Sequence, residues 1–139
     1  MLAPCFYKNS DQCYDDDMLK LFISPAIAAF QAAIDALPTK NVIKIETGNW
    51  GCNLAANAVE ASYMAQFIAV WYLNSFYEGK KEIKLIAYPM ESTTKLLASI
   101  KLMNKLSLAY SGKSFGEIIS SAVALLENAN VRVGNPSCF

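Results

Sequence analysis

The sequence predicts an α/β fold in which a mostly parallel sheet is flanked by helices. Two short runs, residues 41–46 and 82–88, have the β-branched or alternating composition of strands. Between them lies a long apolar segment, residues 54–77, whose length is typical of a helix. Strands that alternate with helices favour parallel pairing, because parallel neighbours need a crossover connection. With 139 residues and 54% apolar composition, the chain fits one domain with a large core.

The N-terminal 40 residues contain an amphipathic helix. Ser24 followed by Pro25 is typical of a helix start, with Ser as the N-cap and Pro at the first helical position. Pro38 ends this helix. Upstream, the acidic run 15–17 has two interpretations: a helix start, where carboxylates favour the positive end of the dipole, or an acidic site. Apolar residues at spacings of three and four mark the buried face of the helix: Ile27, Phe30, Ile34 and Leu37.

The middle of the chain predicts a strand–helix–strand unit. The first strand is NVIKIE, residues 41–46, and the second is EIKLIAY, residues 82–88, which Pro89 stops. The helix between them runs from about Leu54 to Tyr77, is apolar on nearly all sides and ends at Gly79. We expect it to cross over between two neighbouring parallel strands, with right-handed connection.

Two further helices follow. The first starts at about Ser92 and has an apolar face formed by Leu96, Leu97, Ile100, Met103 and Leu106. Ser114 and Glu117 form a capping box that opens the second helix. The segment NVRVG, residues 130–134, is interpreted as a short last strand.

The composition argues against several classes of function. Twelve basic and twelve acidic residues cancel, so we expect no nucleic-acid binding. The chain has no His, and its four Cys match no zinc spacing, so no metal and no cofactor are expected. The apolar segment 61–76 is shorter than the about 20 residues of a membrane span, so no membrane partner is expected. No signal peptide is seen, which favours an intracellular location, cytoplasmic or nuclear, or delivery into a host cytosol.

The loop at residues 47–53 is of a phosphate-binding type. Ligands of α/β sheets bind beyond the carboxyl ends of the strands, where this loop begins. It also leads into a helix N-terminus, where free N–H groups and the dipole favour an anion. Gly48 and Gly51 allow tight turns and close approach of the backbone to a ligand, while Thr47 and Asn49 add hydrogen-bonding groups. The alternative is an ordinary strand-to-helix turn.

The run ETGNWGC, residues 46–52, followed by a helix with MAQFIA, resembles the poly(ADP-ribose) glycohydrolase family of macrodomains. The resemblance covers about residues 42–126 and places Gln66 in the register of a Gln of that family. It implies a partial macrodomain-like fold, with residues 1–40 as an N-terminal segment and helix and residues 41–139 as the C-terminal half. In the family this loop borders the pyrophosphate and distal ribose of ADP-ribose. The ligand-binding residues that the resemblance implies are Thr47, Gly48, Asn49, Trp50, Gly51, Cys52, Asn53 and Tyr88.

Within this set, the resemblance implies different roles. Trp50 is expected to pack and to fix the loop. Tyr88 falls at the second aromatic of a family strand, near the adenosine side, where an aromatic side chain can stack on a nucleobase.

Other positions depart from the family pattern. Asn53 replaces a Gly, Ala55 a Phe, Ala56 and Asn57 a Gly pair, and Ala58 an Asp, so the loop must leave by another path. The family's catalytic element, a triple-Gly loop followed by paired Glu residues, has no counterpart, because the chain contains no Gly-Gly and no Glu-Glu. Glycosidic cleavage needs a positioned acid, so the catalytic residues stay unknown.

The expected function is recognition of ADP-ribose or of ADP-ribosylated protein, with hydrolysis of ADP-ribosyl bonds in an assembled site. The chain would then be the C-terminal part of a longer enzyme or would complete its site with another chain. Two alternatives remain: a non-catalytic ADP-ribose or nucleotide-binding module, and a structural or interaction domain that pairs through an exposed sheet edge. The intact TGNWGC run favours the first two functions, whereas the lost glycines at 53, 56 and 57 favour the two alternatives.

Overall fold

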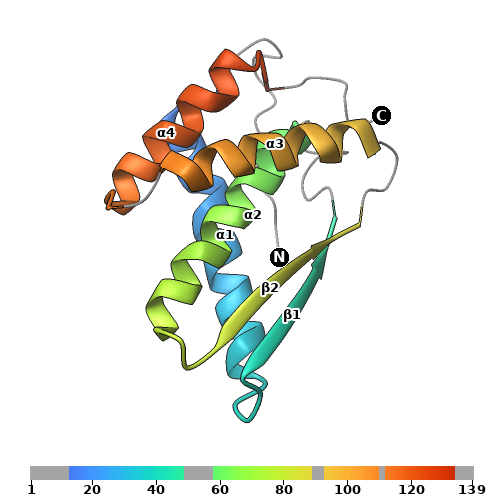
Figure 1. The fold of residues 1–139 in the computed structure, drawn as a ribbon, viewed down its shortest axis with the longest axis vertical. Coiled ribbons are helices and arrows are strands. Elements are labelled where there is room, and N and C mark those ends of the chain that lie inside the picture. Colours follow the sequence, from blue (N-terminus) through green and yellow to red (C-terminus); the bar gives the residue numbers. More distant parts are fainter. Residues whose placement is uncertain (1–12, 49–57, 89–92, 110–111, 134–139) are drawn as a thin grey trace.

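The computed structural model describes residues 13–48, 58–88, 93–109 and 112–133 (Figure 1). They form the elements α1 (Asp16–Asp35), β1 (Val42–Thr47), α2 (Val59–Tyr77), β2 (Glu82–Ala87), α3 (Thr93–Ala109) and α4 (Phe115–Asn128). The predicted mixed α/β class and the alternation of strands with helices are confirmed.

The sheet consists of β1 and β2, which pair in parallel from Val42↔Glu82 to Thr47↔Ala87. Helix α2 connects these two neighbouring strands, so the predicted crossover is confirmed. In the part of the chain that the structure describes, the sheet has two strands, and each strand has one unpaired edge. Their carboxyl ends, where a ligand site was predicted, therefore lie side by side (Figure 1).

Helices α1 and α2 cover one face of this sheet. Ile43 and Ile83 pack in one cluster with Phe30 of α1 and with Leu73 of α2. On the other face, the neighbours Lys44 and Lys84 are exposed, and Ile86 is half-buried. A parallel sheet that is buried on both faces reads as continuous apolar runs, so the alternation in both strands fits one covered face. In the described residues, the two helices that pack on the sheet, α1 and α2, lie on the same face of it.

Helix α2 is the centre of the core. It contacts α1, α3, α4 and β2, and Tyr63, Met64 and Ile68 are fully buried in it (Figure 1). An apolar helix without a polar face requires cover on several sides. The chain's own helices supply much of this cover.

Helix α1 begins earlier than predicted. Its N-cap is Asp15, whose Oδ1 accepts a hydrogen bond from the Met18 N–H at 2.8 Å, so the helix-start interpretation of the acidic run is confirmed. The predicted start at Ser24–Pro25 is wrong, because Pro25 lies inside the helix. A Pro within a helix costs about 3 kcal/mol. Burial of Leu19 and Phe22, upstream of the Pro, offsets this cost.

By length and composition, α1 is also apolar enough to cross a membrane. Its apolar face, however, packs against α2 within the chain's own core. The core helix of a globular protein can meet the same criteria of length and composition.

Helix α3 presents part of the predicted face to the core: Leu106 is buried, and Leu96 and Met103 pack against buried clusters. Ser99, Leu102 and Leu106 are buried, whereas Leu97 and Ile100 are exposed. The hydroxyl of Ser99 donates to the Lys95 carbonyl at 2.8 Å, and this bond inside the helix allows the Ser to be buried. The predicted face did not include Ser99, because a Ser is not expected among the apolar residues of a buried face.

The C-terminal part is close to the prediction. The capping box of Ser114 and Glu117 at the start of α4 is confirmed, with both reciprocal bonds present. The predicted short strand at 130–134 is reduced to one antiparallel bridge between Arg132 and Cys13, whose side chains are also in contact. This bridge joins the start of the described chain to its end.

Candidate functional site

The carboxyl ends of β1 and β2 meet at a surface that we call the carboxyl edge, formed by Thr47, Gly48 and Tyr88. The Tyr88 N–H donates to the Thr47 carbonyl at 2.8 Å, which extends the strand pairing by one further bond. At Gly48, an added Cβ would lie 3.3 Å from the Tyr88 carbonyl oxygen, a tight contact. Glycine therefore lets the two chain segments approach each other closely where the loop leaves the sheet.

The side chain of Gln66 forms hydrogen bonds with two residues of the carboxyl edge, Thr47 and Gly48. It lies on α2, is 0% exposed, and accepts a hydrogen bond from Thr47 Oγ1 at 2.5 Å. Its Nε2 donates to the Gly48 carbonyl at 3.3 Å and to Ser62 Oγ at 3.2 Å. Both ends of the amide are thus used, as a buried polar group requires. The network fixes the first two residues of the predicted phosphate-type loop to the helix that follows it.

Tyr88 gives the carboxyl edge an exposed aromatic ring. The residue is 54% exposed, and its hydroxyl donates to Glu46 Oε1 at 3.4 Å. Glu46 is itself exposed, at the end of β1. An accessible ring beside a carboxylate and two strand ends can stack on a flat ligand and contact its hydroxyl groups.

The structure thus brings together three of the residues that the sequence predicted as ligand-binding: Thr47, Gly48 and Tyr88. The other five predicted residues lie outside the described part of the chain: Asn49, Trp50, Gly51, Cys52 and Asn53. Glu46 and Ser62 were not predicted. Ser62 could have been inferred, because it precedes Gln66 by one helical turn.

The N-terminus of α2 is less open than the prediction of free amide groups requires. The N-cap is Ala58, which has no capping side chain, but its N–H donates to the hydroxyl of Tyr14 at 3.0 Å. Both residues are buried, and Glu60 places a carboxylate in the first turn. A carboxylate at this position uses the favourable end of the helix dipole. This helix end is therefore engaged by groups of the chain itself.

The acidic run at the start of α1 has structural roles. Asp15 caps the helix, and Asp16 Oδ2 accepts a hydrogen bond from Ser120 of α4 at 2.6 Å. These contacts engage the carboxylates of Asp15 and Asp16 within the fold. Within residues 13–48, 58–88, 93–109 and 112–133, no group of three His, Cys, Asp or Glu side chains is placed to hold a metal ion.

Compared with protein-family models, with curated proteins and with solved structures, the chain matches none of them. The carboxyl edge therefore has to be interpreted from its own chemistry. It offers an exposed aromatic ring, a glycine that permits close approach and a loop start fixed by a buried amide. These features suit binding of a flat, polar ligand.

Proposed function

We propose that this chain recognises ADP-ribose, free or attached to protein, at the carboxyl edge of its parallel strands. The observation that carries the proposal is the buried Gln66 amide, which binds Thr47 and Gly48 at once. A buried amide that fixes two successive loop residues makes the loop start rigid. A rigid loop start lowers the entropy that a ligand has to overcome on binding.

Hydrolysis of ADP-ribosyl bonds belongs, in this proposal, to a site that another chain or a further segment completes. Cleavage of a glycosidic bond needs a carboxylic acid near the leaving group and a positioned water. The carboxylate at the carboxyl edge is Glu46, which is exposed and bonded to Tyr88. An exposed carboxylate that accepts one hydrogen bond is not positioned in the way that general acid catalysis requires. We therefore propose recognition as the activity of this chain and leave the family's macrodomain-like fold as part of the same proposal.

The exposed ring of Tyr88 leads to the first prediction. Replacement of Tyr88 by Ala removes the stacking surface for the adenine, and loss of one base–aromatic stack costs about 1–3 kcal/mol of binding free energy. The dissociation constant for ADP-ribose is therefore expected to rise by about 5- to 100-fold. Isothermal titration calorimetry of the purified chain with ADP-ribose measures this change.

Phe76→Ala is the matched control for this experiment. Phe76 is 59% exposed, close to the 54% of Tyr88, but it lies near the C-terminal end of α2. Its removal should leave the affinity for ADP-ribose unchanged. Equal affinity of the Tyr88→Ala variant and the unaltered chain would show that Tyr88 does not take part in binding.

A second candidate function, an interaction domain, is favoured by one face of α3. Leu97, Ile100 and Leu108 are exposed on this helix, at spacings that place them along one side. Exposed apolar side chains in one stripe are typical of a protein contact. The unpaired edges of β1 and β2 offer a further place for pairing with another chain.

If this face binds a second copy of the chain, the mass in solution exceeds the 15.3 kDa of the single chain. The double variant Leu97→Glu with Leu108→Glu is expected to return the mass to that of one chain, because charges on the stripe oppose its burial. Size exclusion coupled to light scattering measures both masses. An unaltered chain that elutes at 15.3 kDa at high concentration would exclude self-association through α3.

A further inference from the structure

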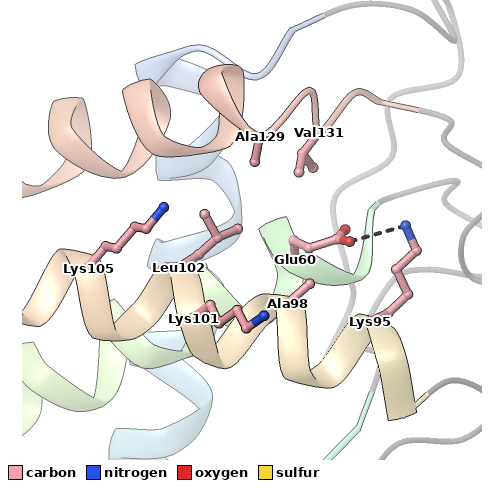
Figure 2. A pocket seen from close by; sticks show the side chains of 8 residues that line it. All are labelled: Glu60, Lys95, Ala98, Lys101, Leu102, Lys105, Ala129 and Val131. Carbon is pink, nitrogen blue, oxygen red and sulfur yellow. Dashed lines mark ion pairs between the residues drawn. The ribbon is translucent and has the colours of Figure 1, made fainter.

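A concave surface lies between α3 and the residues that follow α4. It has a volume of about 330 Å³, and we call it the lysine cleft (Figure 2). Its lining residues are Glu60, Lys95, Ala98, Lys101, Leu102, Lys105, Ala129 and Val131. None of them belongs to the carboxyl edge or to the Gln66 network, so the lysine cleft is independent of the proposed function.

The lysine cleft contains a buried carboxylate with an unused oxygen. Glu60 is 4% exposed, and its Oε1 lies 3.4 Å from Lys95 Nζ. Among the described residues, Glu60 Oε2 has no hydrogen-bond partner although it is buried. A carboxylate oxygen only accepts hydrogen bonds, and a buried acceptor is rarely left unpaired. The position therefore calls for a donor from a molecule that enters the cleft.

The cationic side of the cleft is formed by α3. Figure 2 shows Lys95, Lys101 and Lys105 along this helix, with the Glu60 carboxylate between α3 and Val131. Three lysines and one glutamate line the cleft, which leaves an excess of two positive charges. Within the part of the chain that the structure describes, neither Lys101 nor Lys105 forms an ion pair. Unpaired ammonium groups beside a concave surface attract an anion.

A ligand for this cleft has to satisfy opposite requirements. The lysines require an anion, and Glu60 Oε2 requires a hydrogen-bond donor. A phosphate group that carries one proton meets both, because it has charged oxygens and a P–OH group. Sulfate is similar in size and charge but has no donor, so its oxygen would face Glu60 Oε2 and be repelled. The cleft also has apolar lining residues, which leave room for a small organic group. They are Ala98 and Leu102 of α3, with Ala129 and Val131 after α4.

We propose that the lysine cleft binds a phosphate group, as inorganic phosphate or as a small phosphate monoester, with Lys101 and Lys105 on its charged oxygens and Glu60 Oε2 accepting its P–OH hydrogen. The buried carboxylate supplies the selectivity, because it rejects anions that lack a donor. The lysines supply the attraction.

Titrations of the whole chain, followed by amide chemical shifts in NMR spectra, test this proposal with three probes: inorganic phosphate, β-glycerophosphate and sulfate, at matched ionic strength. Phosphate is expected to cause saturable shifts in residues 95–105 and 129–131, and sulfate to bind about tenfold or more weakly. Tighter binding of inorganic phosphate or of the monoester would support the site in either case and identify the source of the phosphate group.

Two sets of variants separate the roles in the lysine cleft. The double variant Lys101→Met with Lys105→Met is expected to weaken phosphate binding by about tenfold or more, because it removes both unpaired charges. The matched control, Lys20→Met with Lys80→Met, removes two exposed lysines outside the cleft and should leave binding unchanged.

Glu60→Gln adds an N–H donor at the same position, so the preference for phosphate over sulfate is expected to disappear. Lys101 and Lys105 are exposed, so their variants keep the fold and test the site even where Glu60→Gln impairs folding. Equal binding of phosphate and sulfate by the unaltered chain, no saturable shift at millimolar phosphate, or full binding by the double lysine variant would each overturn the proposal.

Discussion

Replacement of Gln66 by Leu is expected to lower the free energy of unfolding by about 2–3 kcal/mol and to weaken ADP-ribose binding. Leu fits a similar volume but cannot bond to Thr47, Gly48 or Ser62, which the Gln66 amide contacts. The Gly48 carbonyl would lose its side-chain partner and the start of the loop would lose its fixed position. Chemical denaturation measures the change in stability, and calorimetry measures the change in affinity.

Two further variants identify the source of this effect. Gln31→Leu makes the same chemical change at a half-buried position of α1 and is expected to cost less than about 1 kcal/mol. Thr47→Val removes one partner of Gln66 while it keeps the shape of the side chain. The double variant Thr47→Val with Gln66→Leu should lose less stability than the sum of the losses in these two single variants, because each of them removes the same hydrogen bond. Fully additive losses would mean that Thr47 and Gln66 do not act as a pair.

Replacement of Phe22 by Ala is expected to have a larger effect, with a loss of about 3–5 kcal/mol of stability. Phe22 is 0% exposed and lies in the main cluster, near the ring of Tyr14 and packed among side chains from α2 and α4. Removal of the ring leaves a cavity that the surrounding helices fill only in part. A loss of this size is a large share of the about 5–15 kcal/mol that stabilises a typical domain.

The neighbouring residue is the control. Leu21 is 56% exposed, so Leu21→Ala is expected to change the stability by about 0.5 kcal/mol or less. Thermal unfolding followed by circular dichroism compares the two variants. Similar losses for Phe22→Ala and Leu21→Ala would mean that α1 does not pack as described and that its residues 16–24 do not belong to the core.

Local patterns were enough to predict most of the fold. The patterns in residues 41–46 and 82–88 predicted both strands to within one residue, and the Ser114–Glu117 box predicted the start of α4. The start of α1 was missed because Pro25 is a strong local signal, whereas the burial of Leu19 and Phe22 depends on α2 and α4, which are distant in the sequence. The face of α3 was predicted in part: Leu96, Met103 and Leu106 pack toward the core, whereas the predicted Leu97 and Ile100 are exposed. Ser99 and Leu102 are buried in their place.

The site was predicted in part for a similar reason. The rule that ligands bind at the carboxyl ends of parallel strands placed Thr47 and Gly48 at the sheet edge, and the resemblance implied Tyr88. The resemblance drew attention to Gln66, but its contacts depend on how α2 lies under the sheet. The lysine cleft could not be predicted, because its lining residues from α2, α3 and the segment after α4 come together only through tertiary packing.

Titration of the isotopically labelled chain with ADP-ribose, followed residue by residue in NMR spectra, tests the central proposal most directly. We expect saturable shifts that are largest at Thr47, Gly48 and Tyr88, which form the carboxyl edge. Residues 101–105 of α3 should shift less, because the lysine cleft shares no lining residue with that edge. Absence of saturable shifts, or shifts that avoid Thr47, Gly48 and Tyr88, would contradict ADP-ribose recognition at this site.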